Sequence, residues 1–470
     1  MEHARFRTPA VLLLTLTLAL STATAFADPT RHSDTRLATE VLQQLIEIDT
    51  THSTGSTGKA AHAMAQRLRN AGFPKSDIHE IGPKPSRGNL VFRWRGNGDQ
   101  KPILLVAHLD VVEAKRSDWS VDPSVFLQRD GYYYGRGTTD DKAMAAIWIA
   151  TVITLKAQGF MPQRDVIVAL TADEEGGDDN GIDWLLKNHK ELIDAAYALN
   201  EGGNGWIKNG KRIANGVQLS EKKYLSFKLQ TTNPGGHSSL PIKDNAIYHL
   251  AQGLGRLAGY DFPVRLNAGT KEFFNQMATL ENGQAAADMR AITGAIPAAD
   301  AIARLSESAY YNALMRTTCI PTMVSAGHAE NALPQSATAV VNCRLLPDES
   351  PDFVEQVLHK QLADPQIKVT PMGEAKASPT SPMDPEVFGA IERATQALWP
   401  GISVIPTMVT GATDGLYLRN AGIPTYGVSG LFEDIDDIRA HGRDERILVK
   451  SFEDGAEFQY RVVRDLTDGD

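Results

Sequence analysis

Beyond Thr35 the sequence alternates between helical and strand patterns, and this alternation limits the folds open to the chain. Short, β-branched apolar runs bounded by turn residues predict buried strands at 89–94, 103–108, 165–170 and 196–200. Longer amphipathic or apolar stretches predict helices at 36–48, 59–71, 141–158 and 182–192. Strands separated by helices favour a mostly parallel sheet with helices on both faces. We therefore expect the α/β class.

The pattern changes from Ser220 onward. A strand at 222–230, a helix at 245–257, two strands around the cysteines, a helix at 353–362 and a strand at 366–371 follow in the order β-α-β-β-α-β. A mainly helical elaboration, 260–316, interrupts this order, and its role is not disclosed by the sequence. The first pattern then resumes, with strands at 402–408 and 424–428 and a helix at 455–463. We expect one discontinuous α/β domain, 28–218 and 377–470, with an inserted domain at 219–376.

The N-terminus has the pattern of a secretory signal peptide. Basic residues precede the apolar stretch Ala10–Leu20, and Ala25-Phe26-Ala27 follows as a cleavage pattern before Asp28. A retained membrane anchor is the alternative, although the apolar stretch is short for a membrane span. We expect residues 1–27 to be removed, which leaves a periplasmic or secreted protein without stable membrane insertion.

Composition excludes some classes of function. The 470 residues carry a formal charge of -10 without a long Lys/Arg run, which argues against nucleic-acid binding. The only two cysteines, Cys319 and Cys343, are too few for a disulfide scaffold or a cysteine-based zinc site. They lie in expected neighbouring strands of an exported chain, so a disulfide and two buried free thiols both remain open.

Histidine and carboxylate side chains follow the expected strands. In open α/β sheets, ligands bind beyond the carboxyl ends of the strands. Those ends, the loop before the long helix and a late loop carry His108, Asp110, Asp140, Asp141, Glu174, Glu175, Glu201 and His441. Taken alone, His108 could be a core or surface histidine, and Asp140 could cap a helix. Their joint placement at one sheet edge predicts a cation site, and imidazole with carboxylate suits zinc, cobalt or manganese.

Charge balance favours two cations over one. Two divalent ions are neutralised by three carboxylates and a bridging hydroxide, whereas a single ion would leave net negative charge in a buried site. Two metal ions roughly 3.5–4 Å apart form a recognised hydrolytic arrangement.

Nine segments in order resemble the dinuclear-zinc exopeptidase family of glutamate carboxypeptidase, carboxypeptidase S and aminoacylase, and the carboxypeptidase S branch is nearest. They are VAHLDVV, YGRGTTDDK, TADEEGG, NEGG, TTNPGGHSS, AENALPQ, VNCRLLP, GATDG and AHGRDE. Nearly everything after the signal peptide is covered. The resemblance implies that 28–218 and 377–470 form a catalytic domain, and that 219–376 forms a lid and dimerisation domain.

The resemblance also implies a set of metal ligands. His108 and Glu201 would bind one zinc ion, Glu175 and His441 the other, and Asp140 would bridge both. It further implies a cis peptide bond between Asp140 and Asp141.

Two further carboxylates have implied catalytic roles. Asp110 would orient the imidazole that binds the metal. Glu174 would be the general base that takes a proton from the bridging water and passes it to the leaving amine. Strand alternation should point Glu174 and Glu175 apart. Glu445 would be structural.

Substrate contacts are implied mainly for the inserted domain. His237 would stabilise the oxyanion, in dimeric relatives from the partner subunit. Arg344 would grip the substrate's terminal carboxylate. The implied substrate-holding positions are Asn331, Gly411 and Thr413.

We therefore expect a zinc metallo-exopeptidase, a carboxypeptidase or dipeptidase that cleaves an amide bond beside a free carboxylate and forms a homodimer. An aminoacylase acting on N-acyl amino acids uses the same chemistry and stays open. A non-catalytic periplasmic binding protein is the rival from another class, and it would have no use for Glu174 as a base.

Overall fold

The computed structural model describes residues 32–377 and 379–468, and from Ser33 onward the chain forms one compact unit. The expected signal peptide, residues 1–27, lies outside the described residues. None of the helices in these two ranges is long and apolar enough to cross a membrane.

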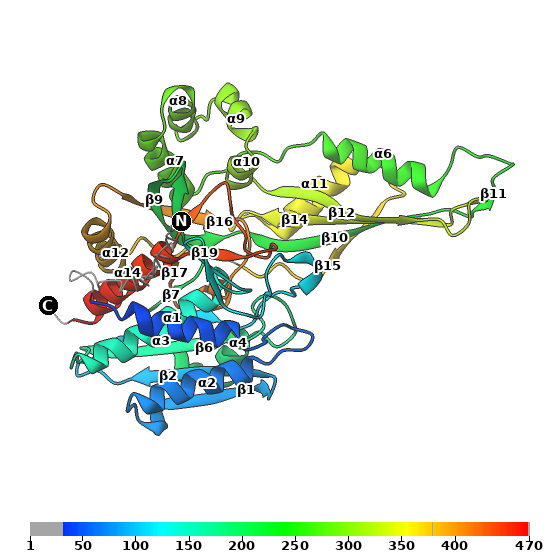
Figure 1. Cartoon of the computed structure of the whole chain (residues 1–470). Helices are drawn as coiled ribbons and strands as arrows, with labels where there is room; N and C mark the ends of the chain where they lie inside the picture. The colour runs from blue at the N-terminus through cyan, green and yellow to red at the C-terminus, as the bar shows by residue number, and fades with distance from the viewer. Residues whose placement is uncertain (1–31, 378, 469–470) are drawn as a thin grey trace, which may run out of the picture. The chain divides into compact units, whose positions relative to one another are not determined.

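A ten-stranded sheet forms the centre of the unit (Figure 1). Nine strands follow the order β1-β2-β6-β3-β7-β17-β9-β8-β18, and β16 pairs with β9. The neighbours β6, β3, β7 and β17 are all parallel, as the alternating sequence pattern predicts. The strands are β1 Ile78–Lys84, β2 Arg87–Trp94, β3 Gln100–His108, β6 Arg164–Thr171, β7 Tyr197–Asn200, β8 Gly205–Lys208, β9 Lys211–Glu221, β16 Ser403–Val409, β17 Thr425–Gly427 and β18 Phe432–Asp434.

Helices cover both faces of this sheet, because its central strands are apolar on both sides. Along β3, Leu105 belongs to the larger hydrophobic core, whereas Leu104 and Val106 belong to a second core on the opposite face. The helices are α1 Thr35–Ile46, α2 Thr57–Asn70, α3 Lys142–Ala157, α4 Gly181–Asn188, α5 Lys190–Ile193, α12 Pro385–Leu398, α13 Gly415–Asn420 and α14 Val449–Thr467. Short elements complete this part: η1 Lys75–Asp77, η2 Arg116–Asp118, and a three-stranded sheet of β4 Leu127–Arg129, β5 Tyr132–Tyr134 and β19 Arg446–Leu448.

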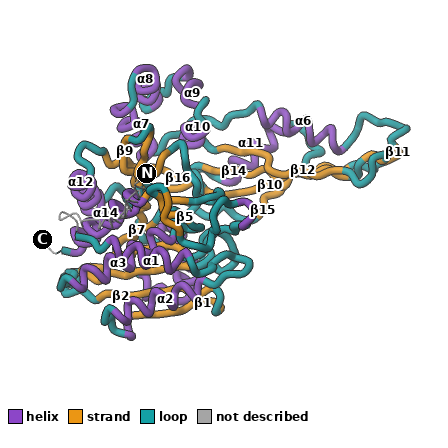
Figure 2. Tube along the Cα trace, viewed as in Figure 1, coloured by secondary structure: helices purple, strands orange, loops and turns teal. Residues whose placement is uncertain are grey.

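The β-α-β-β-α-β order predicted for the inserted segment is present, and its strands form a separate sheet in the order β12-β14-β10-β15 (Figure 2). Its elements are β10 Lys223–Thr232, α6 Ala246–Ala258, β12 Thr318–Ala326, β14 Ser336–Leu345, α11 Pro351–Leu362 and β15 Lys368–Met372. The sheet has a hydrophobic core of its own. Two short strands, β11 Gly236–His237 and β13 Ala332–Leu333, pair beside it.

The two cysteines are paired. Cys319 and Cys343 lie directly opposite each other on β12 and β14, and a disulfide joins them. Of the two states that the sequence left open, the structure shows the bonded one.

The helical elaboration is α7 Ala268–Leu280, α8 Gly283–Ile292, α9 Ala299–Ser306 and α10 Ala309–Met315. Although it interrupts the inserted segment, it packs against the ten-stranded sheet. Phe273 and Phe274 of α7 share a hydrophobic core with Ile405 and Met408 of β16. The elaboration therefore belongs structurally to the large sheet.

This packing gives a stability prediction. Phe274 is fully buried, so Phe274→Ala should leave a cavity and lower the free energy of unfolding by about 3–5 kcal/mol. Ile296, between α8 and α9, is 89% exposed, and Ile296→Ala should change it by less than about 0.5 kcal/mol. Urea denaturation of the two variants measures the difference. Equal stabilities would show that the elaboration does not share the core of the sheet.

Candidate active site

Parallel pairing brings the predicted strand ends to one edge of the large sheet. His108, the last residue of β3, pairs with Thr171, the last residue of β6. β7, the neighbour of β3 on its other side, ends at Asn200 directly before Glu201. Two groups of side chains, each with ligand atoms within 4.8 Å of one another, could hold a metal ion: His108 with Asp141 and Glu201, and His108 with Asp140 and Glu175.

Asp140 lies between two histidines. Its Oδ1 is 2.8 Å from Nε2 of His108, and its Oδ2 is 3.0 Å from Nε2 of His441. On the His441 side, Oε2 of Glu175 is 2.8 Å from the imidazole, and on the His108 side Oε2 of Glu201 is 3.9 Å away. This is the arrangement expected if Asp140 bridges two sites.

Asp141 is an additional acid at this place. The peptide bond from Asp140 to Asp141 is cis, as the family resemblance implied. Asp141 stands at the N-cap position of α3, but its side chain makes no capping hydrogen bond. Its Oδ2 is buried and has no hydrogen-bond partner among the described residues. The sequence analysis gave Asp141 no ligand role, because its position beside Glu201 depends on the turn before α3.

The electrostatics of the cluster favour a bound cation. Burial, and then the charges of neighbouring acids, raises the pKa of Glu201 and of Glu174 well above the usual range. Burial likewise raises the pKa of Asp141. These carboxylates can all be ionised near neutral pH only if positive charge lies among them. Two imidazoles with several carboxylates form a donor set that fits zinc, cobalt or manganese.

Asp110 contacts both the His108 imidazole and the backbone of the acidic loop. Nδ1 of His108 donates to the backbone carbonyl of Asp110 at 3.0 Å, while the Asp110 carboxylate lies 3.6 Å from that nitrogen. The carboxylate also accepts the backbone N–H groups of Glu174 and Glu175, at 3.2 and 3.0 Å. It therefore fixes the acidic loop relative to His108, as well as contacting the imidazole.

The loop geometry corrects one expectation. Strand alternation was expected to separate Glu174 from Glu175, but β6 already ends at Thr171. The two glutamates follow a turn in which Asp173 has φ 54°. The prediction failed because a turn, and not a pleat, sets the directions of these side chains.

The third acid of the triplet is structural. Asp173 is buried, and its Oδ1 lies 2.7 Å from Nε of Arg87 on β2. Asn89 supports the same loop, because its Oδ1 accepts the N–H of Ala172.

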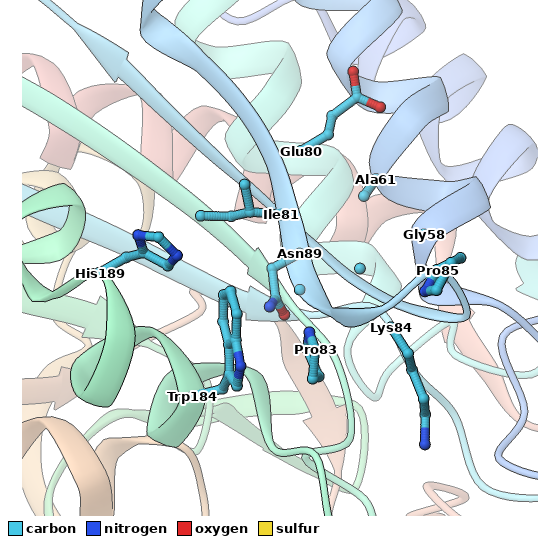
Figure 3. Close-up of a pocket in the computed structure, with 12 residues that line it drawn as sticks. Gly58, Ala61, Glu80, Ile81, Pro83, Lys84, Pro85, Asn89, Trp184 and His189 are labelled. Atoms are coloured by element: carbon cyan, nitrogen blue, oxygen red, sulfur yellow. The ribbon is translucent and has the colours of Figure 1, made fainter.

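Asn89 also borders a surface pocket of about 620 Å³ between Pro83 and Trp184, which none of the predicted site residues lines (Figure 3).

Glu445 holds the loop that carries Asp140, in agreement with its expected structural role. Its carboxylate accepts the backbone N–H groups of Gly137, Thr139 and Asp140. It also forms an ion pair with Arg136 at 2.7 Å. The HGRDE segment thus supplies both His441 and the support for the bridging carboxylate.

The two positions of the GATDG turn that were implied to contact substrate differ in exposure. Thr413 is buried, and its hydroxyl donates to Glu221 at 2.7 Å, whereas Gly411 is partly accessible. Asp414 was not singled out in the sequence; it accepts from Asn180 and Thr171 at 2.7 and 2.9 Å. Burial raises the pKa of Asp414 to about 6. Its position in a short polar turn gave no local signal of this burial.

His237, Asn331 and Arg344 lie on the inserted segment. The β11–β13 pairing brings His237 opposite Ala332, so His237 and Asn331 are neighbours, and both are exposed. The Nδ1 of His237 accepts from the hydroxyl of Ser239 at 2.8 Å. Arg344 lies on β14. Within 32–377 and 379–468, no hydrogen bond or ion pair joins these three residues to the histidine–carboxylate cluster.

The cluster predicts stabilisation by metal. Adding Zn²⁺ or Mn²⁺ to protein freed of metal should raise its unfolding temperature, since a ligand at a hundred times its Kd stabilises by about 2.7 kcal/mol. Asp140→Asn should remove most of this shift. Asp130→Asn is the matched control, because the Asp130 side chain is 81% exposed and lies outside the cluster. A full shift in the Asp140 variant, measured by scanning calorimetry, would contradict a bridging role.

Comparison with known proteins gives the family. Residues 104–465 match the family described as Peptidase family M20/M25/M40. The chain is 28% identical over 389 residues to "Probable carboxypeptidase S-like 2" of Dictyostelium discoideum, covering 80% of this chain and 74% of the relative. It is 28% identical over 429 residues to the human "N-fatty-acyl-amino acid synthase/hydrolase PM20D1", covering 89% and 84%.

A solved structure agrees in fold. The M20 family metallo-carboxypeptidase Sso-CP2 from Sulfolobus solfataricus superposes with a TM-score of 0.70 at 17% identity, covering 92% of this chain and 99% of that chain. The family resemblance and the α/β class are therefore both confirmed, and the family supports a hydrolytic enzyme over a non-catalytic binding protein. The chain belongs to the M20 peptidase family of metal-dependent hydrolytic enzymes.

Proposed function

We propose that this protein is a zinc-dependent carboxypeptidase or dipeptidase, which hydrolyses an amide bond beside a free C-terminal carboxylate. One observation carries the proposal: Asp140 contacts both His108 and His441, and the partly buried Glu174 directly precedes Glu175, which contacts His441 in the same cluster. Such a cluster can hold metal, and Glu174 is available for proton transfer.

We assign two divalent ions to the cluster, with zinc first and cobalt or manganese as alternatives. His108 and Glu201 would hold one ion, Glu175 and His441 the other, and Asp140 both. When bound, such ions lower the pKa of water and polarise the carbonyl of the substrate.

Glu174 acts as the general base in this proposal. Burial raises the pKa of Glu174 well above its usual range. A carboxylate with a raised pKa is a better proton acceptor than an ordinary one. It takes the proton of the attacking water as the C–O bond forms. It then gives that proton to the amide nitrogen as the C–N bond breaks, which releases an amine and a carboxylic acid.

The inserted domain would recognise the substrate. Arg344 can bind a terminal carboxylate through two parallel N–H donors, and the Asn331 amide would hold another part of the substrate. His237 would stabilise the oxyanion of the tetrahedral intermediate. Because His237 makes no contact with the cluster of its own chain among the described residues, we assign this role to His237 of a second copy.

A second copy could pair along β12, which is an edge strand of the smaller sheet. Ile320, Met323 and Val324 on this strand are 64–70% exposed. Unpaired backbone groups beside exposed apolar side chains favour pairing with another chain. We therefore propose a homodimer.

We also propose that residues 1–27 direct export of the protein to the periplasm or the exterior. The disulfide between Cys319 and Cys343 would be maintained in such an oxidising compartment.

An N-acyl amino acid hydrolase is the second candidate. The name of the human relative supports it, and the proposed groups would serve equally, because an amino acid is the leaving group in both reactions. The two candidates differ in the group that is bound on the acyl side of the cleaved amide bond.

A substrate panel tests the proposal. The mature protein, loaded with zinc, is offered dipeptides, longer peptides and N-acyl amino acids, and release of free amino acid is measured. Activity on peptides supports the peptidase, and activity confined to N-acyl substrates supports the second candidate. Glu174→Gln should lower kcat by about 10²–10⁴-fold while metal stays bound. Asp178→Asn, on the exposed part of the same loop, is the control.

Complementation tests the role of the second copy. The Glu174→Gln variant and the His237→Ala variant should each have low catalytic activity alone. Mixing the two variants so that they exchange subunits should restore activity. Each mixed dimer then has one site with Glu174 from one chain and His237 from the other. If exchange is verified with labelled subunits and activity does not recover, His237 does not act on the partner's site.

A further inference from the structure

The surroundings of Arg344 are unusually well defined for a partly exposed arginine. Arg344 on β14 lies directly opposite Tyr224 on β10 and opposite Thr318 on β12. Directly opposite residues of antiparallel strands share a face of the sheet. The Arg344 guanidinium carbon lies 4.8 Å from the centre of the Tyr224 ring, so the cation stacks over the aromatic face.

The Tyr224 ring is itself held in place. The hydroxyl of Ser226, two residues along β10 on the same face, donates to the Tyr224 hydroxyl at 3.1 Å. Asn342, opposite Ser226 on β14, donates to the Ser226 hydroxyl at 3.1 Å. A line of polar contacts across two strands therefore supports an aromatic side chain that is 52% exposed.

Among residues 32–377 and 379–468, the Arg344 guanidinium forms no ion pair with an Asp or Glu, and the Tyr224 ring is the neighbour that stabilises its charge. An aromatic face attracts the cation without occupying its N–H donors. The donors remain available to a carboxylate, while the long side chain is held in one place before the ligand arrives.

We propose that Tyr224 is a positioning residue, which sets Arg344 for the substrate's terminal carboxylate and so contributes to the choice of carboxylate-bearing substrates. This inference rests on the proposed function, in which Arg344 binds that carboxylate. Tyr224 itself needs no contact with the reacting atoms. The ordinary alternative is that the stacking is a surface contact without effect on substrate choice.

The test compares each peptide substrate with its C-terminal amide, which lacks the negative charge. Tyr224→Leu should raise KM for the carboxylate substrate about two- to fivefold, with little change for the amide and in kcat. Tyr224→Phe keeps the ring and should rescue most of this loss. Tyr248→Leu, at an exposed tyrosine of α6, is the matched control. Calorimetric binding of both substrates in a Glu174→Gln background gives the same comparison without turnover.

The Arg344→Gln background separates the possible failures. If Tyr224→Leu adds nothing there but raises KM in the parent protein, the two side chains act as one unit and the inference holds. If Tyr224→Leu affects acid and amide equally, or acts undiminished without Arg344, it is overturned. If Arg344→Gln itself leaves the preference for the acid unchanged, carboxylate recognition by Arg344 in the proposed function fails, and the inference fails with it.

Discussion

Mutual repulsion among buried carboxylates is the constraint on which this structure depends. Asp141, Glu174 and Glu201 lie together at the carboxyl ends of parallel strands, where burial raises the pKa of each carboxyl group. Asp140 beside them differs, because its interactions with His108 and His441 outweigh burial and lower its pKa. The surrounding loops are held by hydrogen bonds and ion pairs from side chains outside the two ligand groups. Asp110 accepts two amides of the acidic loop, Glu445 accepts three amides before Asp140, and Arg87 neutralises Asp173. A loop fixed in this way keeps its acids together even though they repel each other.

Much of this arrangement could be predicted from sequence, because the relevant signals are local. Apolar runs that end in His or Glu identify both the strands and their functional ends, and the parallel order then requires those ends to meet. The β-α-β-β-α-β order was predicted for the same reason. Features that a turn or a distant partner decides could not be predicted in this way. The directions of Glu174 and Glu175 depend on a turn, the burial of Thr413 depends on Glu221, and Asp141 reaches the cluster through the loop before α3.

The proposed function divides recognition and chemistry between two sheets. The histidine–carboxylate cluster belongs to the large sheet, whereas Arg344 and Tyr224 share a face of the small one. In the proposed function, an amide bond is cleaved only when both sheets hold the same molecule, the large one at its carbonyl and the small one at its charged end. Exclusion of substrates without that charge then follows from binding geometry, without any change at the metal site.

The helical elaboration alters how the two sheets are joined. A simple insertion would be connected by two chain segments, one entering and one leaving. Here the chain also enters and leaves the elaboration, so the segments 219–225, 262–273 and 315–319 all run between separate hydrophobic cores. Leu346, directly after β14, packs into the core of the elaboration as well. These added connections restrict rotation of the small sheet relative to the large one more than two chain segments alone would.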